Sequence, residues 1–315
     1  MIPLIDISAA GAASAWDDAM RRLGFVLIEG HGVDAALTQR LYDQVSAFFA
    51  RPLAEKVQFS FAAGGRGQGY LAMGSETVGQ AAGALPDLCE SLTFADPRFD
   101  SAPPDNALDA RLYRANLWPD GMPELRATVT QYMAAGRALA LRLMRLSAVA
   151  LDLPADHFAP FYDKMNLNLR CVLYPDQAEA PRAGQLRNGP HTDFSGFTIL
   201  RQDGAPGGLQ VKAGGGWIDV AAVPGTFVIN AGDLIQRWTN DRWLSNVHRV
   251  ANPPRDAKHG TRRLSLVLFT GPNSDAGITC LPTCTDAAHP PIYPPIVAGL
   301  HSEERMRQTY GARPS

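Results

Sequence analysis

The second half of the chain, from about residue 165, consists of short apolar segments rich in β-branched residues. Turn signals separate them, such as the Gly-Gly-Gly at 214–216 and the Asn-Pro-Pro at 252–254. Many short strands at regular spacing are typical of a β-sandwich or barrel. Strands and helices do not alternate here, which argues against a doubly wound parallel sheet. The predicted strands cover residues 168–173, 198–200, 208–212, 217–220, 226–230, 233–237, 246–250 and 264–269.

The first half of the chain has a helical pattern instead. Segments 13–23 and 37–48 carry apolar residues at helical spacing, and 24–28 between them is predicted as a buried strand. Between residues 125 and 150 the apolar positions recur at alternating steps of four and three, which predicts one long amphipathic helix. A helix of this length suits packing across the outside of a sheet. We therefore expect a mainly β, α+β fold in which helices support a double-sheet core.

Length, charge and hydropathy narrow the class of protein. A chain of 315 residues is compatible with one large domain. The net charge is -2 and the basic residues are scattered, which argues against nucleic-acid binding. The first residues have no secretory pattern, and no apolar run approaches the roughly 18 residues of a membrane span, so we expect a cytoplasmic protein. The four cysteines should then be reduced.

One segment carries a chemical signal, the His-Thr-Asp-Phe-Ser-Gly-Phe-Thr-Ile-Leu sequence at 191–200. Its alternating apolar and small polar residues predict a strand, in which side chains two residues apart point to the same side. His191 and Asp193 would then converge on one point. An imidazole and a carboxylate aimed together are two thirds of the facial triad that holds non-haem Fe(II).

A third ligand must come from the remaining histidines. The chain has seven histidines, and His248 lies in the alternating strand predicted at 246–250. Spacing alone favours His248 only slightly. The others lie in turn-like, helical or near-terminal stretches: His31, His157, His259, His289 and His301.

The order of these motifs resembles the isopenicillin N synthase-like Fe(II)/2-oxoglutarate-dependent oxygenases. Segment 191–200 is similar to the ligand strand of that family, and so is the Val-Pro-Gly-Thr-Phe-Val-Ile-Asn-Ala-Gly-Asp stretch at 223–233. The Ile-Pro-Leu-Ile-Asp-Ile-Ser opening at 2–8 also matches. The resemblance covers nearly the whole chain and is thinnest at 57–120 and after 275.

The resemblance implies a fold, a reaction and its cofactors. The fold is a double-stranded β-helix, or jelly roll, flanked by N-terminal helices. His191, Asp193 and His248 become the ligands of Fe(II). 2-Oxoglutarate is the cosubstrate and O2 the oxidant, with ascorbate as an optional reductant. The expected reaction is hydroxylation of a small molecule, such as an amino acid, a peptide or a natural-product intermediate.

The same resemblance implies a binding site for 2-oxoglutarate. The family's Arg-x-Ser pair falls on Arg263 and Ser265, and Tyr174 precedes Pro175 in the family's Tyr-Pro segment. Arginine offers a planar fork of donors that meets a carboxylate bidentately, and the two hydroxyls add neutral donors. Arg263 and Ser265 are two apart on a predicted strand and share a face. Arg262 is the alternative to Arg263, but it would point to the opposite face.

The site for the prime substrate is less well defined. Arg170 brings a charge into a strand that enters the core, where it either reaches the substrate or pairs with an acid. We expect substrate contacts in the least family-like regions, namely 64–70, 75–90 and the part after 276. Packing is the alternative role for the two phenylalanines among the candidates. The candidate substrate-binding residues are Arg170, Asn168, Tyr70, Phe194 and Phe269.

We expect one oxygenase domain over residues 1–315, with a small-molecule substrate and neither a nucleic acid nor a membrane as partner. Within it we expect a helix-rich scaffold at 1–160, a jelly-roll core with the metal site at 161–275 and a C-terminal extension at 276–315. A monomer should suffice. Two alternatives stay open. One is a related oxidase of the cyclising or ethylene-forming type that works without 2-oxoglutarate, and the other is a non-oxidative zinc-binding jelly-roll protein.

Overall fold

The computed structural model describes residues 1–60, 68–78, 85–177, 179–257 and 259–310. The strands of its larger sheet are β1 (Leu4–Asp6), β2 (Phe25–Glu29), β3 (Gly69–Leu71), β4 (Glu90–Ala95), β5 (Asn166–Tyr174), β7 (Phe197–Gln202), β10 (Phe227–Ala231) and β12 (Arg263–Gly271). Those of the smaller sheet are β6 (Asn188–His191), β8 (Leu209–Ala213), β9 (Gly216–Asp219) and β11 (His248–Val250). The C-terminal part adds the pair β13 (Gly277–Ile278) and β14 (Ile296–Val297).

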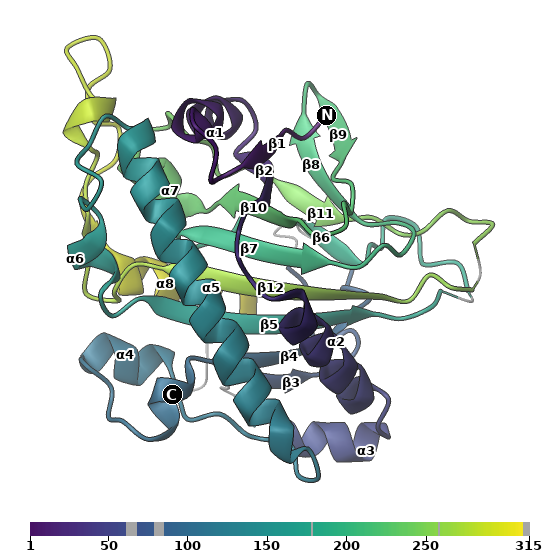
Figure 1. Cartoon of the computed structure of the whole chain (residues 1–315). Coiled ribbons are helices and arrows are strands. Elements are labelled where there is room, and N and C mark those ends of the chain that lie inside the picture. The colour runs from purple at the N-terminus through teal and green to yellow at the C-terminus, as the bar shows by residue number, and fades with distance from the viewer. Residues whose placement is uncertain (61–67, 79–84, 178, 258, 311–315) are drawn as a thin grey trace.

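The helices surround this β core (Figure 1). They are α1 (Ala12–Arg22), α2 (Ala35–Phe49), α3 (Leu53–Lys56), α4 (Ala107–Leu112), α5 (Pro123–Ala150), α6 (Ala159–Tyr162), α7 (Asp233–Trp238) and α8 (Ala298–Tyr310). Short 3-10 turns lie at Val57–Phe59, Pro97–Asp100 and Pro282–Cys284.

The larger sheet joins strands from both halves of the chain. Its order is β1-β2-β10-β7-β12-β5-β4-β3, and that of the smaller sheet is β6-β11-β8-β9. Apart from the parallel pair β1–β2, the ladders within these two sheets are antiparallel. The fold is therefore the expected α+β arrangement, a double-stranded β-helix supported by helices. The predicted N-terminal scaffold supplies strands at both edges of the larger sheet as well as helices.

The long helix α5 packs across the outer face of the larger sheet, as the sequence predicts (Figure 1). Its buried positions include Val129, Leu139 and Leu143. A Cβ at Gly136 would collide with Leu268 of β12, so the glycine allows the helix to approach the sheet closely. Helices α1 and α2 pack beside α5 on the same face.

Strand β5 shows how the sheet separates core from cavity. Leu167, Leu169 and Cys171 belong to the hydrophobic core under the helices. The alternate residues, such as Asn168 and Arg170, line a cavity between the two sheets. This alternation is the two-residue period of a strand with one face toward each layer.

Two predictions of local structure are wrong. Residues 233–237 form helix α7, not a strand, because the buried Leu234, Ile235 and Trp238 follow a helical spacing that a short segment does not distinguish from a strand. Segment 191–200 is not one strand either. β6 ends at His191 in the smaller sheet, and β7 begins at Phe197 in the larger sheet.

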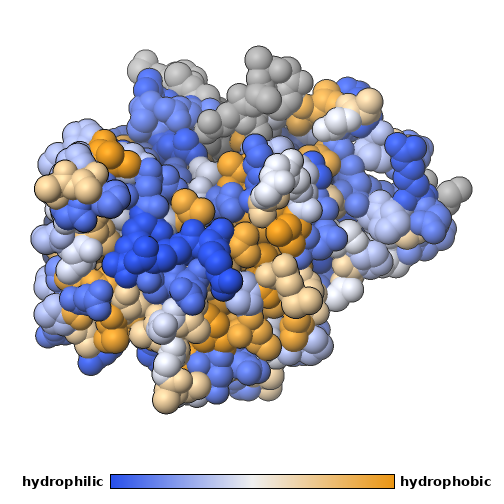
Figure 2. All heavy atoms as spheres, turned by 90° about the horizontal axis from the view of Figure 1, so that it is seen from above, coloured by the Kyte–Doolittle hydropathy of each residue, from blue (hydrophilic) through white to orange (hydrophobic). Residues whose placement is uncertain are grey.

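None of the described helices is both long and apolar enough to cross a bilayer. Seen from above, hydrophilic and hydrophobic residues are interspersed over the surface (Figure 2). Two of the free cysteines, Cys89 and Cys171, are buried, and the other two, Cys280 and Cys284, are partly buried.

Candidate metal centre and active-site cavity

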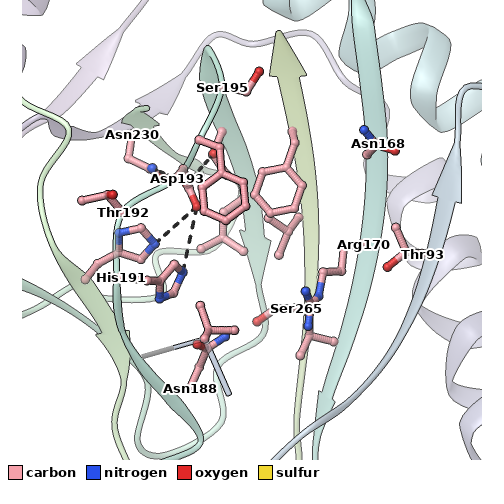
Figure 3. A pocket seen from close by; sticks show the side chains of 18 of the residues that line it. Thr93, Asn168, Arg170, Asn188, His191, Thr192, Asp193, Ser195, Asn230 and Ser265 are labelled. Atoms are coloured by element: carbon pink, nitrogen blue, oxygen red, sulfur yellow. Dashed lines mark hydrogen bonds and ion pairs between the residues drawn. The ribbon is translucent and has the colours of Figure 1, made fainter. Parts of the chain in front are cut away.

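Three potential metal ligands meet in the cavity between the two sheets. His191 at the end of β6 and His248 at the start of β11 are direct cross-strand partners. Asp193 lies in the crossing from β6 to β7, and its Oδ1 is 3.9 Å from Nε2 of His191 and 3.8 Å from Nε2 of His248. One ligand atom from each residue lies within 4.8 Å of the others (Figure 3). The convergence predicted from strand alternation is thus produced by the crossing between sheets.

Backbone carbonyl groups orient both imidazoles. Nδ1 of His191 lies 2.8 Å from the oxygen of Gly189, and Nδ1 of His248 lies 3.1 Å from the oxygen of Asn246. A carbonyl oxygen can only accept, so each Nδ1 carries the proton and each Nε2 presents its lone pair to the centre. This is the tautomer that a metal-binding histidine needs.

The Asp193 carboxylate is oriented in a similar way. Its Oδ2 accepts hydrogen bonds from Oγ1 of Thr198 at 2.5 Å and from Nδ2 of Asn230 at 2.6 Å. Only Oδ1 remains directed at the two imidazoles. Two nitrogens and one carboxylate oxygen on one side of a site form the facial triad that suits non-haem Fe(II).

The electrostatics of His191 and Asp193 favour the protonation states that bind a metal. Burial, reinforced by His248, lowers the pKa of His191 to about 4, so its imidazole is neutral near pH 7. Burial opposes ionisation of Asp193. The two histidines and the hydrogen bonds from Thr198 and Asn230 outweigh it, and the pKa of Asp193 is lowered. A neutral imidazole and an ionised carboxylate are the forms that bind metal.

The predicted 2-oxoglutarate residues line the same cavity. Arg263 is 2% exposed and faces the cavity, whereas Arg262 is exposed to solvent. Tyr174 is the cross-strand partner of Arg263, and Ser265 follows on the same face of β12. We call this part of the cavity, with the triad, the metal end.

Arg263 is held in place mainly by neutral oxygens. Its Nη2 donates to Oε1 of Gln202 at 2.5 Å, and its Nη1 lies 3.4 Å from the backbone oxygens of Asp203 and Ala205. The Asp203 carboxylate is 3.7 Å away with 31% of its side chain exposed. Nε of Arg263 is buried without a hydrogen-bond partner among the described residues. This donor set fits a carboxylate of 2-oxoglutarate.

Four of the five candidate substrate residues reach the cavity. Asn168, Arg170, Phe194 and Phe269 line it, so both phenylalanines are cavity walls. Tyr70 is the exception, and its assignment to the substrate site is wrong. Its side chain points to the helix side of the sheet, where it is 1% exposed and donates to Glu90 at 2.5 Å. The predicted loop at 64–70 lies mostly outside the described residues.

The C-terminal helix α8 completes the other part of the cavity, which we call the substrate end. It contributes Ser302 and Met306 to the lining. Arg305 anchors the helix, with Nη2 at 3.1 Å from Oγ1 of Thr192 and the guanidinium over the ring of Phe194. The remaining residues of the substrate end come from β4, β5, β12 and nearby segments: Val78, Thr93, Tyr113, Asn166, Asn168, Arg170, Phe194, Val267 and Phe269.

Sequence reasoning missed several residues that shape the site. Asn230 lies in the Asn-Ala-Gly-Asp motif, which could have drawn attention to it. Nothing local marks Thr198 as a partner of Asp193 or Glu76 as a partner of Arg170. These pairs become visible only when the chain is folded.

Comparison with known proteins identifies the family. Residues 163–272 match the model of the 2OG-Fe(II) oxygenase superfamily, and residues 2–121 match the N-terminal model described as non-haem dioxygenase in morphine synthesis. The 2-oxoglutarate-Fe(II) type oxidoreductase hxnY of Emericella nidulans is 34% identical over 91% of this chain and 82% of its own length. This chain belongs to the 2OG-Fe(II) oxygenase superfamily. It is an Fe(II)- and 2-oxoglutarate-dependent oxygenase. Membership of this family argues against the two alternatives, a zinc-binding protein and an oxidase that works without 2-oxoglutarate.

Other members of the superfamily resemble the chain along most of its length. Validamycin A dioxygenase of Streptomyces hygroscopicus subsp. limoneus is 32% identical over 89% of this chain and 79% of its own. A Neurospora crassa protein solved with alpha-KG and thymine superposes with a TM-score of 0.84 at 29% identity, covering 97% of this chain and 96% of its own. The rice dioxygenase for auxin oxidation gives a TM-score of 0.73 at 26% identity, with 98% and 95% covered.

Proposed function

We propose that this oxygenase hydroxylates a C–H bond of a small molecule bound at the substrate end of the cavity. The observation that supports the proposal most directly is that the triad and Arg263 open into one cavity, which also has an end with polar and apolar lining residues for a substrate. All these residues come from one chain, which supports a monomer as sufficient and residues 1–315 as a single oxygenase domain.

We assign separate roles to the residues of the metal end. His191, Asp193 and His248 would hold Fe(II), which when bound supplies the redox chemistry that couples oxidation of 2-oxoglutarate to activation of O2. Arg263 would bind the distal carboxylate of 2-oxoglutarate through its guanidinium fork, supported by the hydroxyls of Ser265 and Tyr174. Burial raises the pKa of Tyr174, so its hydroxyl stays protonated and can donate.

The relatives do not name the prime substrate. Their printed names mention compounds as different as thymine and validamycin A, and one is a proline hydroxylase. Hydroxylation is the outcome that these names and the cavity support together. The identity of the substrate has to be inferred from the substrate end of this chain.

The experiment that tests this function is an anaerobic titration of the Fe(II)-loaded protein with 2-oxoglutarate. Chelation of 2-oxoglutarate by iron should produce a visible metal-to-ligand charge-transfer band. In Arg263→Ala the band should be absent at the same concentrations, because the distal carboxylate loses its cationic partner. Arg262→Ala is the matched control, since it removes a neighbouring arginine that is exposed. An unchanged titration in Arg263→Ala would show that the binding site is assigned to the wrong residue.

A further inference from the structure

A row of polar side chains forms the wall of the substrate end that faces the triad (Figure 3). Thr93 on β4 and Arg170 on β5 are cross-strand partners, and Asn168 lies two residues before Arg170 on the same face. We call Thr93, Asn168 and Arg170 the polar wall. These residues are placed to contact whatever lies between them and the triad.

The positive charge of the polar wall is already neutralised inside the protein. Arg170 makes a close ion pair with Glu76, and 12% and 4% of the two side chains are exposed. A second buried carboxylate, Asp87, interacts electrostatically with both residues and is 3% exposed. Asp87 is fixed by hydrogen bonds from the backbone nitrogens of Val78 and Gly189. The charge of one guanidinium is therefore opposed by two buried carboxylates, one paired with it and one acting on it electrostatically.

This arrangement opposes the binding of a third carboxylate. Loss of hydration makes burial of a charge costly unless a partner compensates for it, and Arg170 has already been compensated. The metal end differs because Arg263 is held mainly by neutral oxygens and has a buried Nε without a partner among the described residues. A dicarboxylate such as 2-oxoglutarate is thus directed to Arg263 and away from Arg170.

The polar wall does offer neutral hydrogen-bonding groups. Oγ1 of Thr93 is buried and has no hydrogen-bond partner among the described residues, although Thr93 lines the cavity. Nδ2 of Asn168 makes a long contact of 3.5 Å with Oδ1 of Asn166, and the Asn168 side chain also hydrogen-bonds to the Tyr113 hydroxyl. Buried polar atoms are normally satisfied, so a free hydroxyl in a ligand cavity points to a ligand group as its partner. The same end also has apolar lining residues, which include Phe194, Phe269 and Met306.

We infer that the prime substrate is a neutral molecule whose amide or hydroxyl edge contacts Thr93 and Asn168, and that Glu76 is an internal counter-ion that excludes carboxylate substrates. The inference rests on the proposed function, since it describes the substrate of the same site. It assigns to Glu76 a role in specificity through Arg170, without direct contact with the reacting atoms.

The test compares primary amides with the corresponding carboxylates. The pairs are benzamide and benzoate, phenylacetamide and phenylacetate, and indole-3-acetamide and indole-3-acetate. Isothermal titration calorimetry, without O2, measures their dissociation constants for protein loaded with Fe(II) and 2-oxoglutarate. We expect at least one amide to bind about tenfold or more tightly than its carboxylate. The buried carboxylate would find no uncompensated cation at the polar wall, whereas the amide needs none.

Variants then separate the contributions of charge and shape. Glu76→Gln keeps the size of the side chain and a hydrogen bond to Arg170 but removes the negative charge. It should tighten carboxylate binding about tenfold to a hundredfold and change amide binding by less than about threefold. Thr93→Val should weaken amide binding about fivefold, because the hydroxyl is lost at nearly constant volume. Glu124→Gln, the same change at an exposed position of α5, should alter neither.

Three results would overturn the inference. They are carboxylates that bind the wild type as tightly as the amides, a panel in which no amide binds, and a Glu76→Gln variant without a gain in carboxylate affinity. The charge-transfer band with 2-oxoglutarate is recorded on the same samples before each titration. A failure of the proposed function removes that band, whereas a failure of this inference leaves it intact.

Discussion

The two ends of the cavity are built by different means. At the metal end, the ligands lie on or beside paired strands, and backbone carbonyls, Thr198 and Asn230 fix their orientation. The substrate end adds Val78 and helix α8, from near the other end of the chain, to the paired strands β4 and β5. The difference teaches that the metal end is built from the two sheets and the crossing between them, while the substrate end also depends on Val78 and α8 outside them.

The largest effect should follow from removal of a ligand at the metal end. Asp193→Ala should reduce iron binding and 2-oxoglutarate turnover to background, because the carboxylate oxygen directed at the two imidazoles is lost. Iron content after anaerobic loading and succinate formation are the measurements. Asp219→Ala, at an exposed position of β9, serves as control. Turnover at the wild-type rate in Asp193→Ala would remove Asp193 from the ligand set.

A smaller effect should come from the residues that orient the ligands. Thr198→Val keeps the shape of the side chain but removes the hydrogen bond to Oδ2 of Asp193. We expect iron affinity to fall roughly 10- to 100-fold, the usual cost of losing such a partner, while substrate-end binding stays the same. Competition with a chelator measures the affinity. An unchanged affinity would mean that Asn230 alone orients the carboxylate.

A pH-dependent effect should come from Asp87, which accepts hydrogen bonds from the backbone nitrogens of Val78 and Gly189. Burial raises the pKa of Asp87 from 3.8 to about 6. The folded protein then binds this proton more tightly than the unfolded chain does. Asp87 therefore stabilises the fold below about pH 4, and this contribution is lost as the pH rises through about 6.

Asp87→Asn should abolish that pH dependence. The free energy of unfolding of the wild type, relative to the variant, should fall between pH 4 and 6.5 by on the order of 1–3 kcal/mol. Urea unfolding at several pH values measures it, with Glu124→Gln as a surface control. A constant difference across this range would show that Asp87 does not titrate there.

The smallest effect should be confined to the substrate end. Met306→Ala shortens an apolar side chain of α8 that lines the cavity. The loss of about 1 kcal/mol of apolar contact should weaken amide binding roughly fivefold and leave 2-oxoglutarate affinity unchanged. Calorimetry with both ligands checks the separation. An equal loss for both would argue that the two ends are coupled through α8.

Sequence reasoning was most successful where the signal is local and ordered along the chain. The His-x-Asp pair and the later histidine identified the triad, and the residues of the Arg-x-Ser pair line the same cavity. The apolar steps of four and three located α5. Helix α7 was mistaken for a strand because its six residues are too few to reveal a period.

The substrate end was largely beyond prediction from sequence. The ion pair between Glu76 and Arg170 joins residues 94 positions apart. Tyr70 was assigned to the cavity, but it lies on a strand whose register turns its side chain to the helices. A shift of one residue in register moves a side chain to the other face, and sequence does not fix the register of a three-residue strand.

The position of Asp193 in the crossing between the two sheets also has a consequence for folding. His191 and His248 belong to the smaller sheet, while Thr198 and Asn230, which aim the Asp193 carboxylate, belong to the larger one. The complete ligand set thus exists only after the two sheets have docked. The contacts of Asp193 with Asn230 and of His191 with His248 join segments distant in sequence, and we expect them to form late because the intervening chain must first be closed into loops. We therefore expect the rate of iron uptake by refolding protein to report the docking of the two sheets, which is the last stage in forming the iron site.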